Sequence, residues 1–196
     1  MFSYCVNSPA VFGDSAGNCP HTLYSPWMND CDQCIIYDVP LYDQGKYSLC
    51  WAYCQTMIED YKSKRKQNNS SAELSAISLA LLRKNKDGYW DKGSFPTNCK
   101  LNSSGMPTPM FVSSYFTIGD LYTLLQNTGP IYAYYENANS AHLVVVVGVN
   151  LKDGVVYTNN PWGKKGAQSY ERFTVSVVGK SGEYPYSLTH FYIPEI

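Results

Sequence analysis

The sequence predicts an α+β fold in which helices precede an antiparallel β-sheet. In the first half of the chain, apolar residues recur at helical spacing. In the second half, short runs of β-branched and aromatic residues alternate with turn-forming residues. Helices followed by strands is the order typical of α+β proteins. At 196 residues the chain can bury an ordinary core, so we expect one domain over residues 1–196.

We expect this domain to have three parts. Residues 1–37 form a Cys-rich N-terminal segment in which Gly, Pro, Asn and Ser are frequent and no periodicity is sustained. Residues 38–116 form a helical lobe around a central buried helix. Residues 117–196 form a mainly β lobe, an antiparallel sheet or barrel, against which the helical lobe packs.

The central helix is expected to begin near Ser48, whose hydroxyl suits an N-cap. The apolar residues that follow recur at intervals of three and four, so they share one face of a helix. These residues are Cys50, Cys54, Met57, Ile58 and Tyr61.

Capping boxes indicate two further helices. One begins at Ser70 with Glu73 three residues later, and the next begins at Thr117 with Asp120 at the same spacing. The latter ends at Gly129-Pro130, because neither residue readily continues a helix. The expected apolar stripes are Leu74, Ile77 and Leu81 in the first of these helices, and Leu121, Leu124 and Leu125 in the second.

The strands follow from β-branched and aromatic runs. They are expected over residues 131–135, 142–149, 155–158, 173–178 and 188–193. Asp153-Gly154 predicts a hairpin turn between the second and third of these strands. Residues 85–116 carry many Gly, Pro, Asn and Ser residues and are expected to form a long irregular connection.

Composition and charge argue against several classes of partner. The net charge is −1 with both signs scattered, which favours neither a nucleic acid nor a membrane surface. No apolar run approaches the roughly 20 residues of a membrane-spanning helix. The N-terminus lacks the pattern of a signal peptide. Charged residues make up only 16% of the chain and Tyr numbers 18, which is typical of an extracellular protein.

Seven cysteines are many for this length: Cys5, Cys19, Cys31, Cys34, Cys50, Cys54 and Cys99. With one thiol kept for chemistry, six could form three disulfides in an oxidising compartment, in any of 15 pairings. A structural zinc site at Cys5, Cys19, Cys31 and Cys34 is the alternative, although only the last two have zinc-finger spacing. A redox role for Cys31-Asp32-Gln33-Cys34 is less favoured, because a strand-like run follows it where a redox motif would open a helix.

Residues 43–52 have the features that a cysteine nucleophile requires. The thiolate attacks and the thiol does not, so the nucleophile needs a lowered pKa. The first turn of a helix favours an anion through its unpaired N–H groups and its dipole, and Cys50 falls in that turn. Gln44 lies six residues earlier, in a loop that can fold back beside the helix start. Its side-chain amide and the Cys50 backbone N–H would then stabilise a developing oxyanion.

Gln44 followed six residues later by Cys50-Trp51-Ala52 resembles the papain-like cysteine peptidases. The resemblance continues with Ala141-His142-Leu143-Val144 and Asn160-Pro161-Trp162-Gly163, which keep the family order of Cys, His and Asn. The Asn-Pro-Trp form is similar to small secreted staphopain-type bacterial enzymes. Cys-Trp-Ala with a second Cys one turn later is similar to papain-like bacterial effector peptidases. Plant and lysosomal members usually have Gly-Ser-Cys before the Trp, where this chain has Ser48-Leu49-Cys50.

The resemblance spans residues 38–163 and implies a papain-like fold with hydrolysis of peptide bonds through an acyl-enzyme. Cys50 would be the nucleophile, and His142 would be the general base and then the acid. Asn160 would orient the imidazole, and Gln44 would complete the oxyanion hole.

The same resemblance implies substrate contacts by Trp51 and Trp162, with Trp162 also shielding the His–Asn hydrogen bond from solvent. It implies a protein or peptide substrate, with a proteinaceous inhibitor or a propeptide as a further partner. It implies no cofactor and no metal. We expect a monomer that is secreted or delivered as an effector.

Several neighbours compete with the chosen residues. Asn159 adjoins Asn160, but the Trp two residues later favours Asn160. We expect Cys54, His21 and His190 to be structural and Asp43 to be a surface turn residue.

Two other functions suit the same residues. The triad also serves transpeptidation, deamidation or leader-peptide processing, because only the group that resolves the acyl-enzyme differs. The remaining alternative is a catalytically silent binding module on the same scaffold.

Overall fold

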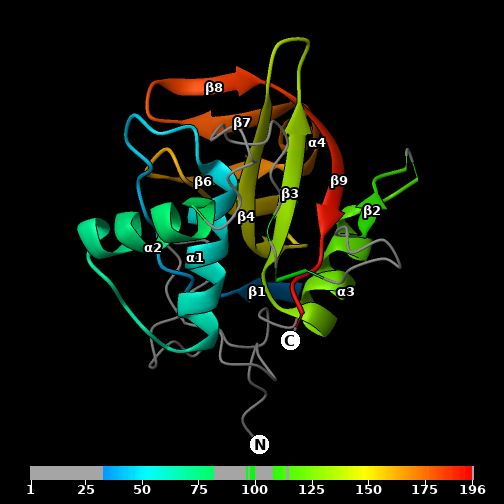
Figure 1. Cartoon of the computed structure of the whole chain (residues 1–196). Coiled ribbons are helices and arrows are strands. Elements are labelled where there is room, and N and C mark those ends of the chain that lie inside the picture. Colours follow the sequence, from blue (N-terminus) through cyan, green and yellow to red (C-terminus); the bar gives the residue numbers. More distant parts are fainter. Residues whose placement is uncertain (1–32, 82–95, 97, 100–107, 114, 196) are drawn as a thin grey trace, which may run out of the picture.

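The computed structural model describes residues 33–81, 96, 98–99, 108–113 and 115–195. An antiparallel sheet forms the centre of this part of the molecule, and helices pack around it (Figure 1). The α+β class is therefore confirmed, while the division into two lobes stays a prediction. In chain order the elements are β1 (Cys34–Ile36), α1 (Cys50–Lys62), α2 (Asn69–Leu81), β2 (Pro109–Phe111), α3 (Ile118–Thr128), β3 (Ile131–Glu136), β4 (Ala141–Asn150), β5 (Val155–Asn160), β6 (Lys164–Ser169), α4 (Tyr170–Val175), β7 (Ser176–Gly179), β8 (Gly182–Pro185) and β9 (Ser187–Tyr192).

Strand β4 is the centre of the sheet. The strand order is β2-β9-β3-β4-β5-β6, β1 also pairs with β4, and every pairing is antiparallel. Residues 142–150 are all buried, which explains the unbroken apolar run at 143–147. The turn at Asp153-Gly154 joins β4 to β5 as predicted, and Gly154 has the positive φ of 67° that such a turn favours.

Helix α1 lies against β4, and α2 packs on α1 (Figure 1). Burial extends around much of α1, as expected for a helix at the centre of a domain. The predicted N-cap at Ser48 is wrong, because the helix begins at Cys50 and its N-cap is Leu49, which makes no side-chain capping bond. Leu49 is buried and Ser48 is exposed, so core packing sets the start of this helix.

Helix α2 differs from its predicted pattern. The helix begins at Asn69, and the side chain of Asn68 caps it by accepting from the Ser71 N–H at 2.9 Å. The predicted apolar stripe is wrong for its two leucines, since Leu74 is 68% and Leu81 is 53% exposed. The buried positions, at intervals of four, are Ala72, Ala76 and Ala80. Small residues at a helix contact allow the two axes to approach closely, and this contact outweighs the larger apolar area of the Leu side chains.

Helix α3 forms as predicted. The Thr117 hydroxyl accepts from the Asp120 N–H at 3.2 Å, and the Asp120 carboxylate accepts from the Thr117 N–H at 2.8 Å. The helix ends before Gly129, whose φ is 74°. Leu121 and Leu125 are fully buried beneath it.

The predicted strand over 173–178 is partly wrong. Residues 170–175 form α4, because Ser169 caps a helical turn by accepting from the Arg172 N–H and Phe173 anchors the turn in the core. The strand β7 begins only at Ser176. Strand β6 has no β-branched residue and forms by pairing with β5, which no local pattern indicates.

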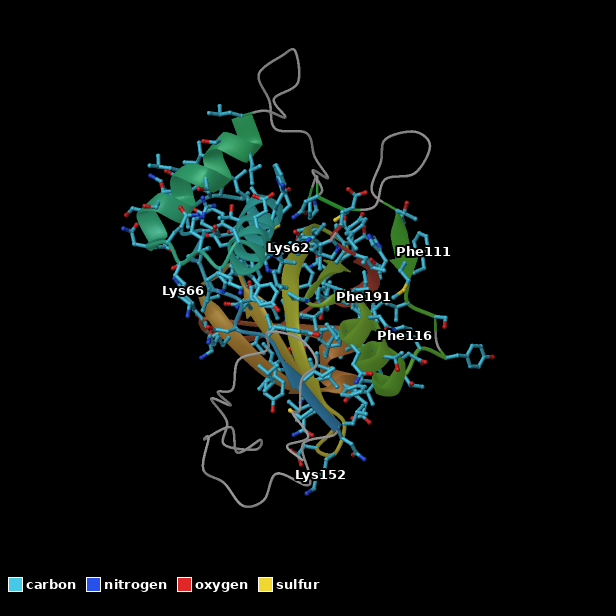
Figure 2. All side chains as sticks on the ribbon, turned by 90° about the horizontal axis from the view of Figure 1, so that it is seen from below. Lys62, Lys66, Phe111, Phe116, Lys152 and Phe191 are labelled. Carbon is cyan, nitrogen blue, oxygen red and sulfur yellow. The ribbon has the colours of Figure 1, made fainter. Side chains whose placement is uncertain are left out.

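Strand β2 lies within the segment predicted to be irregular. It pairs with β9 at the edge of the sheet, with Met110 opposite Phe191. Figure 2 shows Phe111 towards the outside of the molecule and Phe191 further inside, in agreement with exposed fractions of 72% and 0%. None of the helices in the described ranges is both long and apolar enough to cross a membrane.

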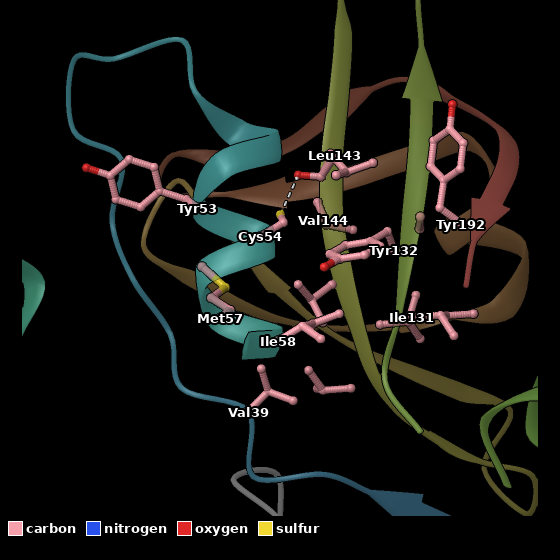
Figure 3. Packing of buried hydrophobic residues seen from close by; sticks show 14 of the residues in the cluster. Val39, Tyr53, Cys54, Met57, Ile58, Ile131, Tyr132, Leu143, Val144 and Tyr192 are labelled. Atoms are coloured by element: carbon pink, nitrogen blue, oxygen red, sulfur yellow. Dashed lines mark hydrogen bonds between the residues drawn. The ribbon is translucent and has the colours of Figure 1, made fainter. Parts of the chain in front are cut away.

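The cysteine predictions are tested only in part. No disulfide joins any two of Cys34, Cys50, Cys54 and Cys99. The remaining three cysteines, Cys5, Cys19 and Cys31, lie outside the described residues. The three-disulfide framework is wrong, because it needs all six cysteines other than Cys50 and Cys54 is a free thiol. The alternative zinc site stays a prediction. Cys54 is structural, as expected: it is buried, and its thiol donates to the Leu143 carbonyl at 3.3 Å (Figure 3).

Candidate active site

The sheet topology brings His142 and Asn160 together. His142 is the second residue of β4 and Asn160 is the last residue of β5, and the two ends adjoin because these strands form an antiparallel hairpin. Nε2 of His142 lies 2.9 Å from Oδ1 of Asn160, and both side chains are buried.

The orientation of the Asn160 amide is set by two further bonds. Its Nδ2 donates to the Val178 carbonyl at 2.7 Å, and its Oδ1 accepts from the Trp162 N–H at 3.0 Å. The oxygen therefore faces His142, whose Nε2 must carry the proton that it donates. Nδ1 is then the basic ring nitrogen, and no hydrogen bond joins it to any residue that the structure describes.

Trp162 covers the imidazole. Its ring stacks on His142 with centroids 4.0 Å apart and an interplanar angle of 21°. Gly179 lies close to the indole, since an added Cβ there would be 2.8 Å from Cε3 of Trp162 and 2.6 Å from Cε2 of Tyr184. Only glycine leaves room for this indole.

Cys50 is the first residue of α1, and its sulfur lies beside the start of β4. Backbone groups of Leu143, the residue after His142, and of Trp51 and Cys50 itself act to lower the pKa of the Cys50 thiol. Cys54, one turn later, reaches the carbonyl of the same Leu143. The first two turns of α1 are thus held against the residue next to His142.

Burial has the largest effect on the pKa values of Cys50 and His142. Burial raises the pKa of Cys50, and the backbone hydrogen bonds lower it less. The prediction that the helix start lowers the pKa of Cys50 is therefore wrong for the thiol without a charged partner. Burial also lowers the pKa of His142 to about 4, although the bond to Asn160 acts to raise it. A thiolate and an imidazolium in contact would each reduce the cost of charging the other.

Gln44 lies next to the loop that carries Asn160 and Trp162. Its backbone N–H donates to the Pro161 carbonyl at 2.7 Å. Its side chain is 7% exposed, and Nε2 donates to the Tyr47 carbonyl at 2.6 Å. Oε1 is buried without a partner among the described residues. One N–H of the amide remains for a ligand.

The remaining predicted residues are either buried or outside the described residues. Asn159 donates to the Val39 carbonyl at 2.7 Å and serves the core, which leaves Asn160 as the partner of His142. Trp51 is only 7% exposed, so it offers little surface, and its substrate contact stays a prediction. His190 is buried and stacks on Tyr134 at 4.5 Å, as a structural residue would, while His21 lies outside the described residues.

The sequence analysis missed Asn69 and Lys180 near the site, and it gave Asp43 only the role of a surface turn residue. Asp43 forms an ion pair with Lys180, and its backbone exchanges two hydrogen bonds with the Asn69 side chain. Asp43 and Lys180, with Gly45, Trp162 and Tyr184, line a cavity of about 260 Å³. No local signal links these positions, because they come from three separate segments.

Comparison with known proteins agrees with this geometry. The profile of the family described as papain-like cysteine protease AvrRpt2 matches residues 33–177, which is more than half of the 196-residue chain. This span includes Gln44, Cys50, His142 and Asn160. The fold and the family together define a papain-like cysteine peptidase, a hydrolase that acts on protein substrates. The chain belongs to the papain-like cysteine protease AvrRpt2 family. No curated protein matches the chain.

Proposed function

We propose that this peptidase hydrolyses internal peptide bonds through a Cys50–His142–Asn160 triad. One observation carries the proposal. The Asn160 side chain holds Nε2 of His142 at 2.9 Å, and Cys50 is the first residue of the helix α1, which packs against β4, the strand that carries His142. This arrangement leaves Nδ1 of His142 to accept the thiol proton.

The chemistry is acyl transfer. As the Cys50 sulfur attacks the substrate carbonyl, its proton passes to Nδ1 of His142, and the resulting imidazolium is stabilised by Asn160. His142 then protonates the leaving amine, and the C–N bond breaks. In the second half, His142 removes a proton from water, which attacks the thioester and releases Cys50.

Gln44 and the Cys50 backbone N–H are the proposed oxyanion donors. The Tyr47 carbonyl holds the amide nitrogen of Gln44 in place, since reversing the amide would bring two oxygens together. Loss of one such donor typically lowers turnover by about 10²–10³-fold. We therefore expect Gln44→Ala to lower kcat by about that factor.

Cleavage of a peptide library tests the proposal. Wild type should cleave, and Cys50→Ala should not. Cys54→Ala is the matched control, because it removes the neighbouring buried thiol without touching the proposed chemistry. Equal product patterns from wild type and Cys50→Ala would defeat the proposal and favour a silent binding module.

Alkylation separates the role of His142 from that of Cys50. In His142→Ala the thiolate has no imidazolium beside it, so only backbone groups oppose the burial that raises the pKa of Cys50. Iodoacetamide should then label Cys50 more slowly at pH 7 than in wild type, and its rate should rise only at alkaline pH. Identical pH profiles in the two proteins would contradict the pairing.

The fate of the acyl-enzyme distinguishes the alternatives. Hydrolysis yields two peptides, transpeptidation joins the acyl group to an amine, and deamidation raises the mass of a glutamine or asparagine by about 1 Da. Product mass spectrometry with and without an added amine separates the three. Leader-peptide processing, an inhibitor or propeptide as partner, a monomeric state, and secretion or delivery as an effector all remain proposals.

A further inference from the structure

Asp43, Gln44 and Gly45, called here the Gln44 turn, are anchored from three directions. The first anchor is the loop after β5, where the Pro161 carbonyl accepts from the Gln44 N–H. In the same place Asp43 and Trp162 pair as an isolated antiparallel β-bridge. The position of the proposed oxyanion donor is thereby tied to the residues that hold His142.

The second anchor is the start of α2. The side chain of Asn69 accepts from the Asp43 N–H at 2.7 Å and donates to the Asp43 carbonyl at 3.0 Å. A side-chain amide that satisfies both backbone groups of one residue acts as a strand partner would and restrains φ and ψ there. Helix capping does not require this side chain, because Asn68 already caps α2.

The third anchor is the turn between β7 and β8. Lys180 forms an ion pair with the Asp43 carboxylate, whose Oδ1 also accepts from the Gly45 N–H at 2.9 Å. This second bond is an Asx-turn, and Gly45 has the positive φ of 57° that suits it. Burial acts to raise the pKa of Asp43, but the bonds from Lys180 and Gly45 hold it below its ordinary value.

We propose that Asp43 and Asn69 are positioning residues for the oxyanion site, acting through Gln44. The inference rests on the proposed function of Gln44. Asn69 restrains the backbone that leads into Gln44, and the Asp43 carboxylate shapes the turn that follows. An oxyanion donor is effective only when it is already in place as charge develops, so a turn without these restraints stabilises the oxyanion less.

A double-mutant cycle between Asn69→Ala and Gln44→Ala tests the proposal. Asn69→Ala should lower kcat about tenfold with little change in KM, because the lost interaction operates in the transition state. In the Gln44→Ala background the same change should lower kcat less than about twofold, since no donor is left to position. Lys180→Met should lower kcat by less than Asn69→Ala does, and Lys180→Arg should keep kcat at the wild-type value.

The matched control is Asn68→Ala, one residue away. It removes the cap of α2 and should lower the free energy of unfolding by about 1 kcal/mol, yet leave kcat unchanged. An equal loss of kcat from Asn69→Ala with and without Gln44 would overturn the proposal. No loss in either background would do the same.

A second measurement does not depend on catalysis. The side-chain amide of Gln44 can be identified by NMR from its absence in Gln44→Ala. In wild type the hydrogen that is donated to Tyr47 should exchange slowly, because it is buried and hydrogen-bonded. Asn69→Ala should speed this exchange several-fold, and an unchanged rate would overturn the proposal even if the protein proved inactive. Inactivity of wild type would count against the proposed function alone.

Discussion

Oδ1 of Asn160 lies 2.9 Å from Nε2 of His142, and Nδ2 of the same Asn160 donates to the Val178 carbonyl. The imidazole is therefore oriented by an amide that is itself held at both ends. The strand β7 that supplies Val178 continues to Gly179, which leaves room for Trp162, and the following turn carries Lys180. One short segment thus supports the His142–Asn160 pair, the indole stacked on His142 and the turn of Gln44.

Replacing Asn160 by Ala should lower kcat by about 10²-fold while leaving the fold intact. The Nε2 proton would lose its acceptor, so the ring could rotate or adopt the tautomer with the wrong nitrogen facing Cys50. Steady-state kinetics on a cleaved peptide measures the loss. The control is Asn159→Ala, which removes a core bond to Val39 and should reduce thermal stability with little effect on kcat. Equal kcat values for the two variants would contradict the role of Asn160.

The low-pH stability of the fold should depend on His142. In the Cys50→Ala protein no thiolate opposes burial, and the pKa of His142 is about 4 in the folded state against 6.5 for a free imidazole. Between these values the unfolded chain binds a proton that the folded chain does not. The free energy of unfolding should therefore fall by about 3 kcal/mol as pH drops from 6.5 to 4.

Urea unfolding at several pH values measures this loss. Other titrating groups contribute equally to Cys50→Ala and to Cys50→Ala/His142→Gln, so the difference between the two proteins isolates His142. That difference should shrink steadily below pH 6.5. Parallel curves would show that His142 is not buried as a neutral ring.

Gly179→Ala should reduce activity through Trp162. The added methyl group would lie 2.8 Å from the indole and would displace it from its stack on His142. We expect kcat to fall about tenfold, with quenching or shift of Trp fluorescence that reports the displacement. Gly119→Ala is the control, because its nearest neighbour would be 3.5 Å away and its place in α3 favours Ala. Wild-type kcat and unchanged fluorescence in Gly179→Ala would contradict this prediction.

The buried carboxylate of Asp60 should matter for stability rather than for chemistry. It accepts from the Tyr42 hydroxyl at 2.7 Å and from Gln67 at 2.8 Å, and it pairs with Arg65. Asp60→Ala would leave the buried Tyr42 hydroxyl without this acceptor and should lower the free energy of unfolding by about 3 kcal/mol.

An exposed ion pair provides the comparison for Asp60. Asp38 pairs with Lys66 at 2.8 Å near the surface, and Asp38→Ala should cost less than about 1 kcal/mol. Both changes are read from urea unfolding curves. Similar losses from Asp38→Ala and Asp60→Ala would mean that burial does not set the difference.

Local pattern was sufficient where a structure depends on neighbours in the chain. The Thr117–Asp120 capping box and the Asp153-Gly154 turn formed as predicted, because their bonds join residues only a few positions apart. The α+β class followed from periodicity for the same reason. The order of Gln44, Cys50, His142 and Asn160 was readable as a family motif, and their catalytic roles remain predictions.

The tertiary structure decided what no neighbouring residue specifies. Ala72 rather than Leu74 faces α1, and 173–175 is helical rather than extended, because packing partners elsewhere in the chain outweigh local preference. The pKa of Cys50 depends on burial, which the helix position alone does not reveal. Asn69 and Lys180 meet Asp43 from segments 26 and 137 residues away. Contacts between such distant segments form only when the whole chain has folded, so the sequence named the candidate reacting groups and the fold supplied their supports.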